Sequence, residues 1–174
     1  MRQNSERDRE FYDFVAGRRG KLLKTARLLT GGDIYLAEDL VQHVLTKLYV
    51  SWSSFKRADN PDGYLRRVLV NAMTDERRRR WRMFERSVPA LPDLPASEHV
   101  AVDEPELAQA LRELPPKMRA AIVFRFYHQL DVAETAEALG VSQGTVKSQT
   151  ARALDKLRAA LLRTDTYHSQ GAHR

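Results

Sequence analysis

The segment Asp131–Leu154, DVAETAEALGVSQGTVKSQTARAL, has the pattern of a helix-turn-helix. Ala136 is small, as a close crossing of two helices requires, and Leu139 closes the first helix. Gly140 can adopt the positive φ of a tight turn, and Ser142 can cap the helix that follows. An ordinary helical hairpin with a polar face is the alternative interpretation.

The second helix of this pair has an apolar side and a polar side. Val141 is expected to be buried in the core. The buried side of the second helix is expected to hold Val146, Leu154, Leu157 and Leu161. Polar side chains occupy the exposed side near the helix start, where recognition helices contact base edges in the major groove. These candidate DNA-binding residues are Ser142, Gln143, Thr145, Lys147, Ser148, Gln149 and Arg152.

Two short amphipathic helices are expected upstream, Glu106–Leu114 and Lys117–Tyr127. Before them, the segment Ser87–Pro105 holds four of the seven prolines and cannot form a continuous helix. We interpret it as an extended linker between two small helical domains. Residues 164–174 are predicted to form a disordered tail.

The first half of the chain is predicted to contain three helices. They are Phe11–Leu29, Ile34–Tyr49 and a third that starts near Pro61 and runs from Tyr64 to about Phe84. Apolar residues recur in them at steps of three and four, which indicates one buried face in each helix. Residues 51–62 read as a polar loop that carries aromatic side chains.

The third helix contains four consecutive arginines, Arg77–Arg80, followed by Trp81. At about 100° per residue they cover every side of a helix, and a cluster beside aromatic rings is typical of nucleic-acid binding. A solvated basic helix end is the alternative. Net charge alternates along the chain: +5 over residues 64–86, −5 over 87–116 and +4 over 117–163.

Composition excludes several classes of protein. The 174 residues contain no cysteine and carry a net charge of +6, so a disulfide scaffold is excluded and a polyanionic partner is favoured. No apolar run approaches the ~18 residues of a membrane span, and the charged start does not resemble a signal peptide, so a cytoplasmic protein is expected. The residues Thr30–Asp33 form neither a P-loop nor a cyclase GGDEF motif, and the five histidines lack metal-site spacing. We therefore expect no enzyme, no metal and no cofactor.

Together the two blocks resemble the extracytoplasmic-function (ECF, group 4) RNA polymerase sigma factors of bacteria, over roughly residues 10–163. AEDLVQHVLTKLYVSW, residues 37–52, resembles the polymerase-binding helix of sigma region 2. PDGYLRRVLVNAMTDERRRR, residues 61–80, resembles its −10-element helix. LGVSQGTVKSQTARALDKLR, residues 139–158, is similar to the −35-reading helix-turn-helix of region 4. The basic composition and the Arg-rich helix are closest to the actinobacterial branch.

The resemblance implies an all-α fold of two small helical domains joined by a linker. Residues 1–86 would be region 2, 87–105 the acidic linker and 106–163 region 4. The implied function is that of an alternative sigma factor, which brings core RNA polymerase to promoters, reads duplex −35 DNA and opens the −10 element. The linker, with Asp93, Glu98, Asp103 and Glu104, would enter the RNA path of polymerase; a merely solubilising linker is the alternative.

The resemblance also assigns roles to individual residues. The polymerase-binding face would hold Glu38, Asp39, Gln42, His43 and Lys47, where His43 replaces the usual acid. The −10 contacts would be Phe55, Lys56, Arg57, Asn60, Tyr64, Asn71, Asp75 and Arg77, Arg78, Arg79, Arg80. Tyr64 stands where the family often has Trp, and Gln149 replaces a common Arg of the −35 helix.

The implied partners are core RNA polymerase and promoter DNA, with a monomeric chain. The polymerase contacts would be the clamp helices of the largest subunit and the flap of the second largest. Many relatives are held inactive by an anti-sigma factor, and the resemblance leaves room for such a regulated interaction protein here. The rival interpretation is a conventional dimeric helix-turn-helix regulator that binds a duplex operator.

Overall fold

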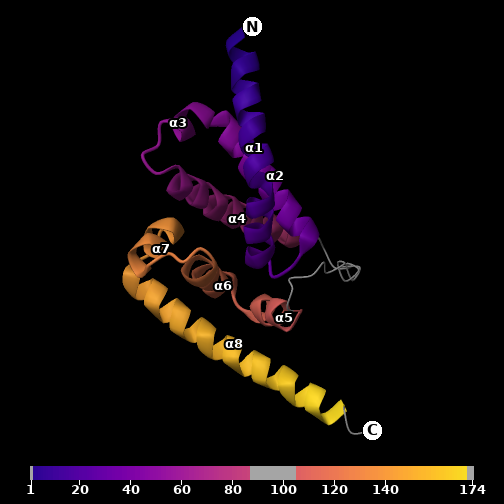
Figure 1. Cartoon of the computed structure of the whole chain (residues 1–174). Helices are drawn as coiled ribbons and strands as arrows, with labels where there is room; N and C mark the ends of the chain where they lie inside the picture. Colours follow the sequence, from indigo (N-terminus) through magenta and orange to yellow (C-terminus); the bar gives the residue numbers. More distant parts are fainter. Residues whose placement is uncertain (1, 87–104, 172–174) are drawn as a thin grey trace. The chain divides into compact units, whose positions relative to one another are not determined.

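The computed structural model describes the backbone of residues 2–86 and 105–171, and the side chains of residues 5–76 and 106–163. Within these ranges all regular structure is helical (Figure 1), which confirms the predicted all-α class. The elements are α1 (Arg2–Leu29), α2 (Ile34–Val50), α3 (Trp52–Lys56), α4 (Pro61–Arg86), α5 (Pro105–Glu113), α6 (Pro116–Ile122), η1 (Val123–Tyr127), α7 (Val132–Leu139) and α8 (Gln143–Gly171).

The chain divides into two compact units. The first comprises Met1–Ala26 and Tyr35–Ser97, and the second comprises Arg27–Ile34 and Glu98–Arg174. The acidic residues predicted for the linker fall in 87–104, outside the described residues, and so do the side chains of Arg77–Arg80. The predicted domain boundaries therefore remain predictions. Within the described ranges, no helix has the length and apolar character needed to cross a membrane.

The core of the first unit follows the predicted apolar stripe of α2. Helix α2 buries residues at steps of three and four, and α1 and α4 contribute matching apolar positions, as expected for amphipathic helices that share one core. The buried side chains are Leu22 and Ala26 from α1, Ala37, Leu40, Val41, Val44 and Leu48 from α2, and Leu65, Leu69 and Ala72 from α4.

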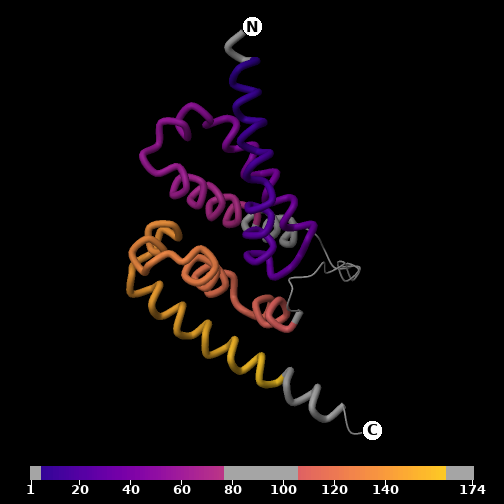
Figure 2. The backbone as a smooth tube through the Cα atoms, viewed as in Figure 1, coloured from indigo at the N-terminus to yellow at the C-terminus, as the bar shows by residue number. Residues whose placement is uncertain are grey.

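The segment predicted as a polar loop contains a short helix, so that prediction was wrong for residues 52–56. Trp52 and Phe55 are only 4% and 7% exposed, and their rings stack with centroids 5.2 Å apart. The rings of Phe11 and Phe14 in α1 meet Trp52 edge-on, each at 5.2 Å. Burial of these aromatic groups stabilises a turn that the polar residues around it do not favour. Figure 2 follows the backbone through this turn from α2 into α4.

Helix α4 begins at Pro61 because Asn60 supplies a side-chain cap and proline suits the first helical position. Asn60 Oδ1 accepts a hydrogen bond from the Gly63 amide at 2.8 Å, and proline is favoured at a first helical position. Asp62 pairs with Arg18 of α1 at 2.7 Å, and this hydrogen bond lowers the pKa of Asp62. The start of α4 is thereby tied to α1.

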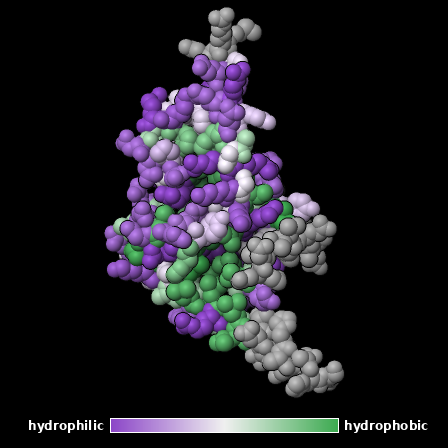
Figure 3. All heavy atoms as spheres, in the orientation of Figure 1, coloured by the Kyte–Doolittle hydropathy of each residue, from purple (hydrophilic) through white to green (hydrophobic). Residues whose placement is uncertain are grey.

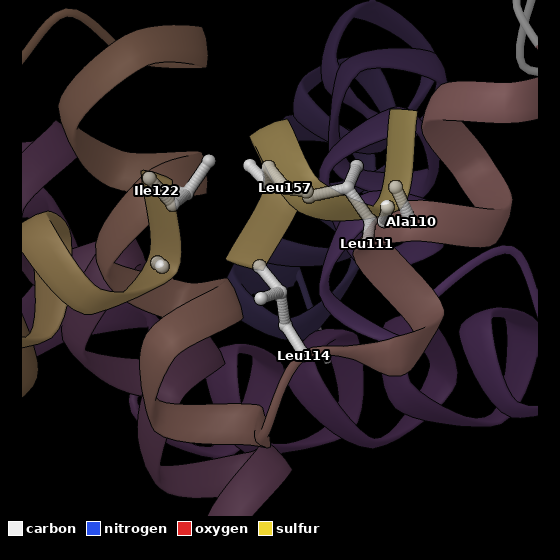
Figure 4. Close-up of a cluster of buried hydrophobic side chains, with 7 residues drawn as sticks. Ala110, Leu111, Leu114, Ile122 and Leu157 are labelled. Atoms are coloured by element: carbon white, nitrogen blue, oxygen red, sulfur yellow. The ribbon is translucent and has the colours of Figure 1, made fainter. Parts of the chain in front are cut away.

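In the second unit, α5, α6 and α7 pack along the long helix α8 (Figure 1). Figure 4 shows the buried apolar cluster to which α5, α6 and α8 contribute. Arg119 is also buried; it donates to the carbonyl oxygens of Arg112 and Leu114 at 3.1 and 2.9 Å, and burial lowers its pKa. The cluster comprises Ala110, Leu111, Leu114, Ile122, Ala153, Leu157 and Ala160.

The helix-turn-helix turns at Gly140, which has φ 64° and ψ 38°. The Gly140 amide donates to the Glu137 carbonyl at 3.3 Å and the Val141 amide to that of Ala136 at 3.0 Å, the paired bonds of a Schellman motif. Ser142 Oγ then accepts from the Thr145 amide at 3.1 Å and caps α8. The predicted turn and cap residues therefore take the positions that the sequence indicated.

Two details of the second unit differ from the prediction. The helix predicted for residues 117–127 changes at Val123 into the π-helical turn η1, where the His128 amide bonds the Val123 carbonyl at 3.0 Å. Leu154, predicted to be buried, is 39% exposed, because the neighbouring Ala153 occupies the inward position. The backbone of residues 164–171 continues α8, where no helix-breaking residue precedes Gly171; residues 172–174 lie outside the described residues, and the disordered tail over 164–174 stays a prediction.

Helix α8 thus presents apolar surface as well as charge. Leu162 is 60% exposed, and Figure 3 shows apolar side chains at the surface over this helix. Val141, which precedes α8, is half-buried and not buried in the core as the sequence predicted.

The turn provides a test of backbone conformation alone. A Cβ at Gly140 would meet nothing within 4 Å, so we expect Gly140→Ala to lower the free energy of unfolding by about 1 kcal/mol through its positive φ only. Gly144→Ala is the matched control, because Gly144 is inside α8 and alanine there should be neutral or stabilising by up to about 1 kcal/mol. Urea unfolding followed by circular dichroism measures both. Equal effects of the two substitutions would contradict this account of the turn.

Candidate nucleic-acid and polymerase interfaces

The exposed start of α8 carries basic and amide side chains. Gln143, Lys147 and Arg152 are exposed, and neither cation forms an ion pair within the described residues. Gln143 and Lys147 are one helical turn apart and adjoin on the helix surface, whereas Arg152 lies about 140° around the helix from Lys147. Long, unpaired donors near the start of a recognition helix can reach base edges or phosphates.

The hydroxyl groups predicted for the same site form hydrogen bonds within the start of α8. Ser142 Oγ lies 2.9 Å from Thr145 Oγ1, and Ser148 Oγ donates to the Thr145 carbonyl at 3.0 Å. Gln149 is half-buried, and its side-chain oxygen is buried without a hydrogen-bond partner in the described part of the chain. The structure therefore presents Gln143, Lys147 and Arg152 outward, while the other four predicted residues shape or border the helix start.

A capping box that the sequence analysis missed fixes the start of α7. The Glu134 amide donates to Asp131 Oδ1, and the Asp131 amide donates to Glu134 Oε2, both at 2.8 Å. The D-x-x-E spacing before an apolar run is the sequence signal that would have identified it. The two helices of the motif are thus both capped by side chains at their first residues.

The residues predicted to contact the −10 element gather at the corner between α3 and α4. Lys56, Arg57 and Asn60 are exposed there, and Tyr64 is half-buried with its ring 5.8 Å from that of Phe55. Phe55 itself is buried in the aromatic cluster, so its side chain supports the corner and is not presented to a ligand. Asn60 caps α4 through its side-chain oxygen.

Two further predicted residues lie along α4, about 10 Å or more from Tyr64 by the helical rise. Asn71 is exposed. Asp75 forms an ion pair with Lys47 of α2, in which Asp75 Oδ2 and Lys47 Nζ are 2.5 Å apart. This pair joins a residue predicted to contact DNA to a residue predicted to contact polymerase. The corner and the middle of α4 therefore form two separate parts of the predicted −10 surface.

The predicted polymerase-binding residues of α2 do not share one face. Glu38 pairs with Arg19 of α1 at 2.6 Å, and Lys47 pairs with Asp75 of α4. At 100° per residue, Glu38 and Lys47 lie about 180° apart around the helix. Asp39 and Gln42 are exposed between these two flanks, and His43 is half-buried.

The exposed stripe of α2 extends beyond the predicted residues. Tyr35 and Val50 are 68% and 76% exposed, and Thr46 is also exposed. Residues 35, 39, 42, 46 and 50 recur at steps of three and four, which is the signal that could have identified them. Among the described residues, no group of three or more His, Asp or Glu side chains could hold a metal ion.

Comparison with known families matches both parts of the chain. The model of sigma-70 region 2 matches residues 14–83, and the model of sigma-70 region 4 matches residues 105–157. The RNA polymerase sigma-E factor of Streptomyces coelicolor is 39% identical over 90% of this chain and 88% of its own length. The ECF RNA polymerase sigma factor SigM of Mycobacterium tuberculosis is 32% identical over 95% of this chain and 83% of its own length. Both organisms are actinobacteria, in agreement with the branch that the sequence indicated.

Two solved structures are similar. The sigma factor RpoE of Bartonella quintana, in complex with the anti-sigma factor NepR, aligns with a TM-score of 0.70 at 27% identity. The alignment covers 90% of this chain and 98% of that one. CnrH, in complex with the cytosolic domain of CnrY, aligns with a TM-score of 0.58 at 26% identity, over 91% of this chain and 90% of that one.

The local bonds of Ser142 predict a structural effect that an asparagine can rescue. Ser142→Ala should lower the free energy of unfolding by about 1 kcal/mol, because the Thr145 amide loses its acceptor. Ser142→Asn supplies another capping oxygen and should restore most of that loss. Urea unfolding of both variants tests this, and a stable alanine variant would show that the cap contributes nothing.

Proposed function

The chain belongs to the ECF group of the sigma-70 family of RNA polymerase sigma factors, and we propose that its two units divide promoter recognition between them. It is an alternative sigma factor that directs RNA polymerase. The observation that carries the function is the match of both sigma regions, in order, along one chain. A conventional dimeric regulator is not favoured, because it would leave the region 2 match without a role.

We propose that α8 reads the −35 element from the major groove. The supporting observations are the exposed, unpaired side chain of Lys147 beside exposed Gln143, and the exposed, unpaired side chain of Arg152 further along the helix, after a helix start that Gly140 and Ser142 define. Such donors bind base acceptors or phosphates, and only the former contribute to sequence choice. Ser142, Thr145 and Ser148 act in this proposal by holding the helix start.

For the −10 element, we propose that Lys56, Arg57 and Tyr64 contact the opened strand at the α3–α4 corner. Exposed cations beside a half-buried ring provide phosphate and stacking contacts for unpaired bases. Asn71 would extend this surface along α4, and Arg77–Arg80 would add phosphate contacts. Phe55 and Asn60 serve as supports, since their side chains are engaged within the unit.

The exposed stripe of α2 is proposed as the polymerase-binding face, opposite the clamp helices of the largest subunit. Asp39 and Gln42 form its centre, and the ion pairs of Glu38 and Lys47 hold α2 against α1 and α4 on either side. The second unit would contact the flap of the second-largest subunit. Half-buried His43 borders the stripe.

Regulation by an anti-sigma factor is a further part of the proposal. One similar structure is the sigma factor RpoE in complex with the anti-sigma factor NepR, and the other is CnrH in complex with the cytosolic domain of CnrY. A partner of that kind would compete with polymerase for the same surfaces. We infer that the chain acts in the cytoplasm, as a monomer on polymerase, and performs no catalysis of its own.

The −35 assignment predicts a change in sequence preference. Lys147→Ala or Arg152→Ala should cost about 1–3 kcal/mol at the base pairs that the side chain contacts, and little elsewhere. Run-off transcription with core polymerase from a library of −35 sequences measures this. Lys156→Ala is the control for Lys147→Ala, since Lys156 is an exposed lysine about 180° around the same helix from Lys147. A uniform loss over all sequences would identify phosphate contacts instead.

The polymerase assignment predicts a loss of affinity with no loss of DNA preference. Asp39→Ala and Gln42→Ala should each weaken binding to core polymerase by about tenfold, as expected for central interface residues. Titration of labelled chain with core enzyme measures this affinity. Asp59→Ala, which removes an exposed carboxylate outside α2, should leave it unchanged. Unchanged affinity in the α2 variants would place the polymerase contact elsewhere.

A further inference from the structure

The first turns of α1 carry side chains that reach α2 and α3. Arg7, Glu10, Phe11 and Phe14 recur at steps of three and four and therefore share one face of the helix. The first three of them precede the part of the chain that matches sigma region 2. The family match therefore says nothing about the contacts that these three residues make.

Glu10 contacts α3 at both of its ends. Its Oε2 accepts a hydrogen bond from Trp52 Nε1 at 3.4 Å and another from Lys56 Nζ. Residues 52 and 56 are one helical turn apart, so a single carboxylate spans the whole of this short helix. The hydrogen bond from Lys56 also lowers the pKa of Glu10.

The same face of α1 holds the end of α2. Tyr49 Oη donates to Asp8 Oδ1 at 2.6 Å, and the guanidinium of Arg7 lies 4.7 Å from the centre of the Tyr49 ring. Phe11 lies edge-on to both Tyr49 and Trp52, at 5.1 and 5.2 Å. Helix α1 therefore contacts both sides of the junction between α2 and α3.

Helix α3 depends on such contacts because it cannot hold a position by itself. Isolated helices below ~12 residues are marginal in water, and α3 has five residues. Burial of Trp52 and Phe55 attaches one side of it to the core. Lys56 is exposed one turn after Trp52 and has a flexible stem, so its ion pair with Glu10 selects one of many positions for the ammonium group.

We propose that Glu10 is a positioning residue for −10 recognition, which orients α3 and Lys56 toward the opened strand without touching DNA. The inference rests on the proposed function of the α3–α4 corner. Loss of the Glu10 carboxylate would leave the aromatic cluster in place and release the cation, so base discrimination would fall while the fold persisted.

The test compares Glu10→Gln with Asp13→Asn in the full chain bound to core bacterial RNA polymerase. Both substitutions remove one negative charge from α1, and Asp13 is exposed with no ion pair among the described residues. Run-off transcription is measured from two promoter libraries, one varied at −10 and one at −35. Glu10→Gln should reduce discrimination among −10 sequences by about two- to fivefold, the effect of losing an exposed ion pair. Its −35 preference and melting temperature should match those of Asp13→Asn.

A double-mutant cycle with Lys56→Gln tests whether Glu10 influences discrimination among −10 sequences through Lys56. If Glu10 acts through Lys56, Glu10→Gln should add little once Lys56 is already replaced. Additive effects, equal behaviour of Glu10→Gln and Asp13→Asn, or a loss spread over both libraries with a lower melting temperature would each overturn the proposal. If the wild-type chain itself fails to initiate with core polymerase, the proposed function fails with it. Initiation by the wild type together with an unaffected Glu10→Gln variant refutes only the positioning role.

Discussion

The stacked rings of Trp52 and Phe55 are the contact on which the α3–α4 corner of the first unit depends. Helix α3 has too few residues for stability by backbone hydrogen bonds alone, so the buried rings decide where it lies. Phe11 and Phe14 of α1 close the cluster, and Tyr64 links it to α4. Lys56 and Arg57 follow Phe55 in the chain and are positioned by this small aromatic core, to which α1 contributes two rings.

In the second unit, the backbone geometry of a turn, and not a cluster of rings, sets the direction of the candidate DNA-binding helix α8. This helix is long and well capped, and its direction follows from the left-handed conformation of Gly140 and the cap at Ser142. A buried line from Val146 through Ala153 to Leu157 and Ala160 then seats α8 on the shorter helices. The exposed cations Lys147 and Arg152 are therefore held on a rigid element, which suits the reading of a regular duplex, whereas the α3–α4 corner suits single-stranded bases.

Ion pairs engage residues that the sequence places on one helix face with two different helices. The pattern of α2 suggests one polar face from Glu38 to Lys47, yet each of these two charges is engaged by a different neighbouring helix. Periodicity predicted the buried stripe of α2 well, because burial recurs every three or four residues. It could not separate the exposed polar residues from those that bind α1 or α4, because that choice depends on partners 19 and 28 positions away in the chain.

The sequence by itself determined the helix-turn-helix, its Gly140 turn, its Ser142 cap and the amphipathic helix α2, because caps, positive φ and apolar spacing act between near neighbours. Only the tertiary structure decided that residues 52–56 form a helix, that Phe55 points inward and that Ala153 rather than Leu154 faces the core. Side chains brought together from distant positions produce these features, so local preference is overridden by the burial of large rings and by the space available at each contact.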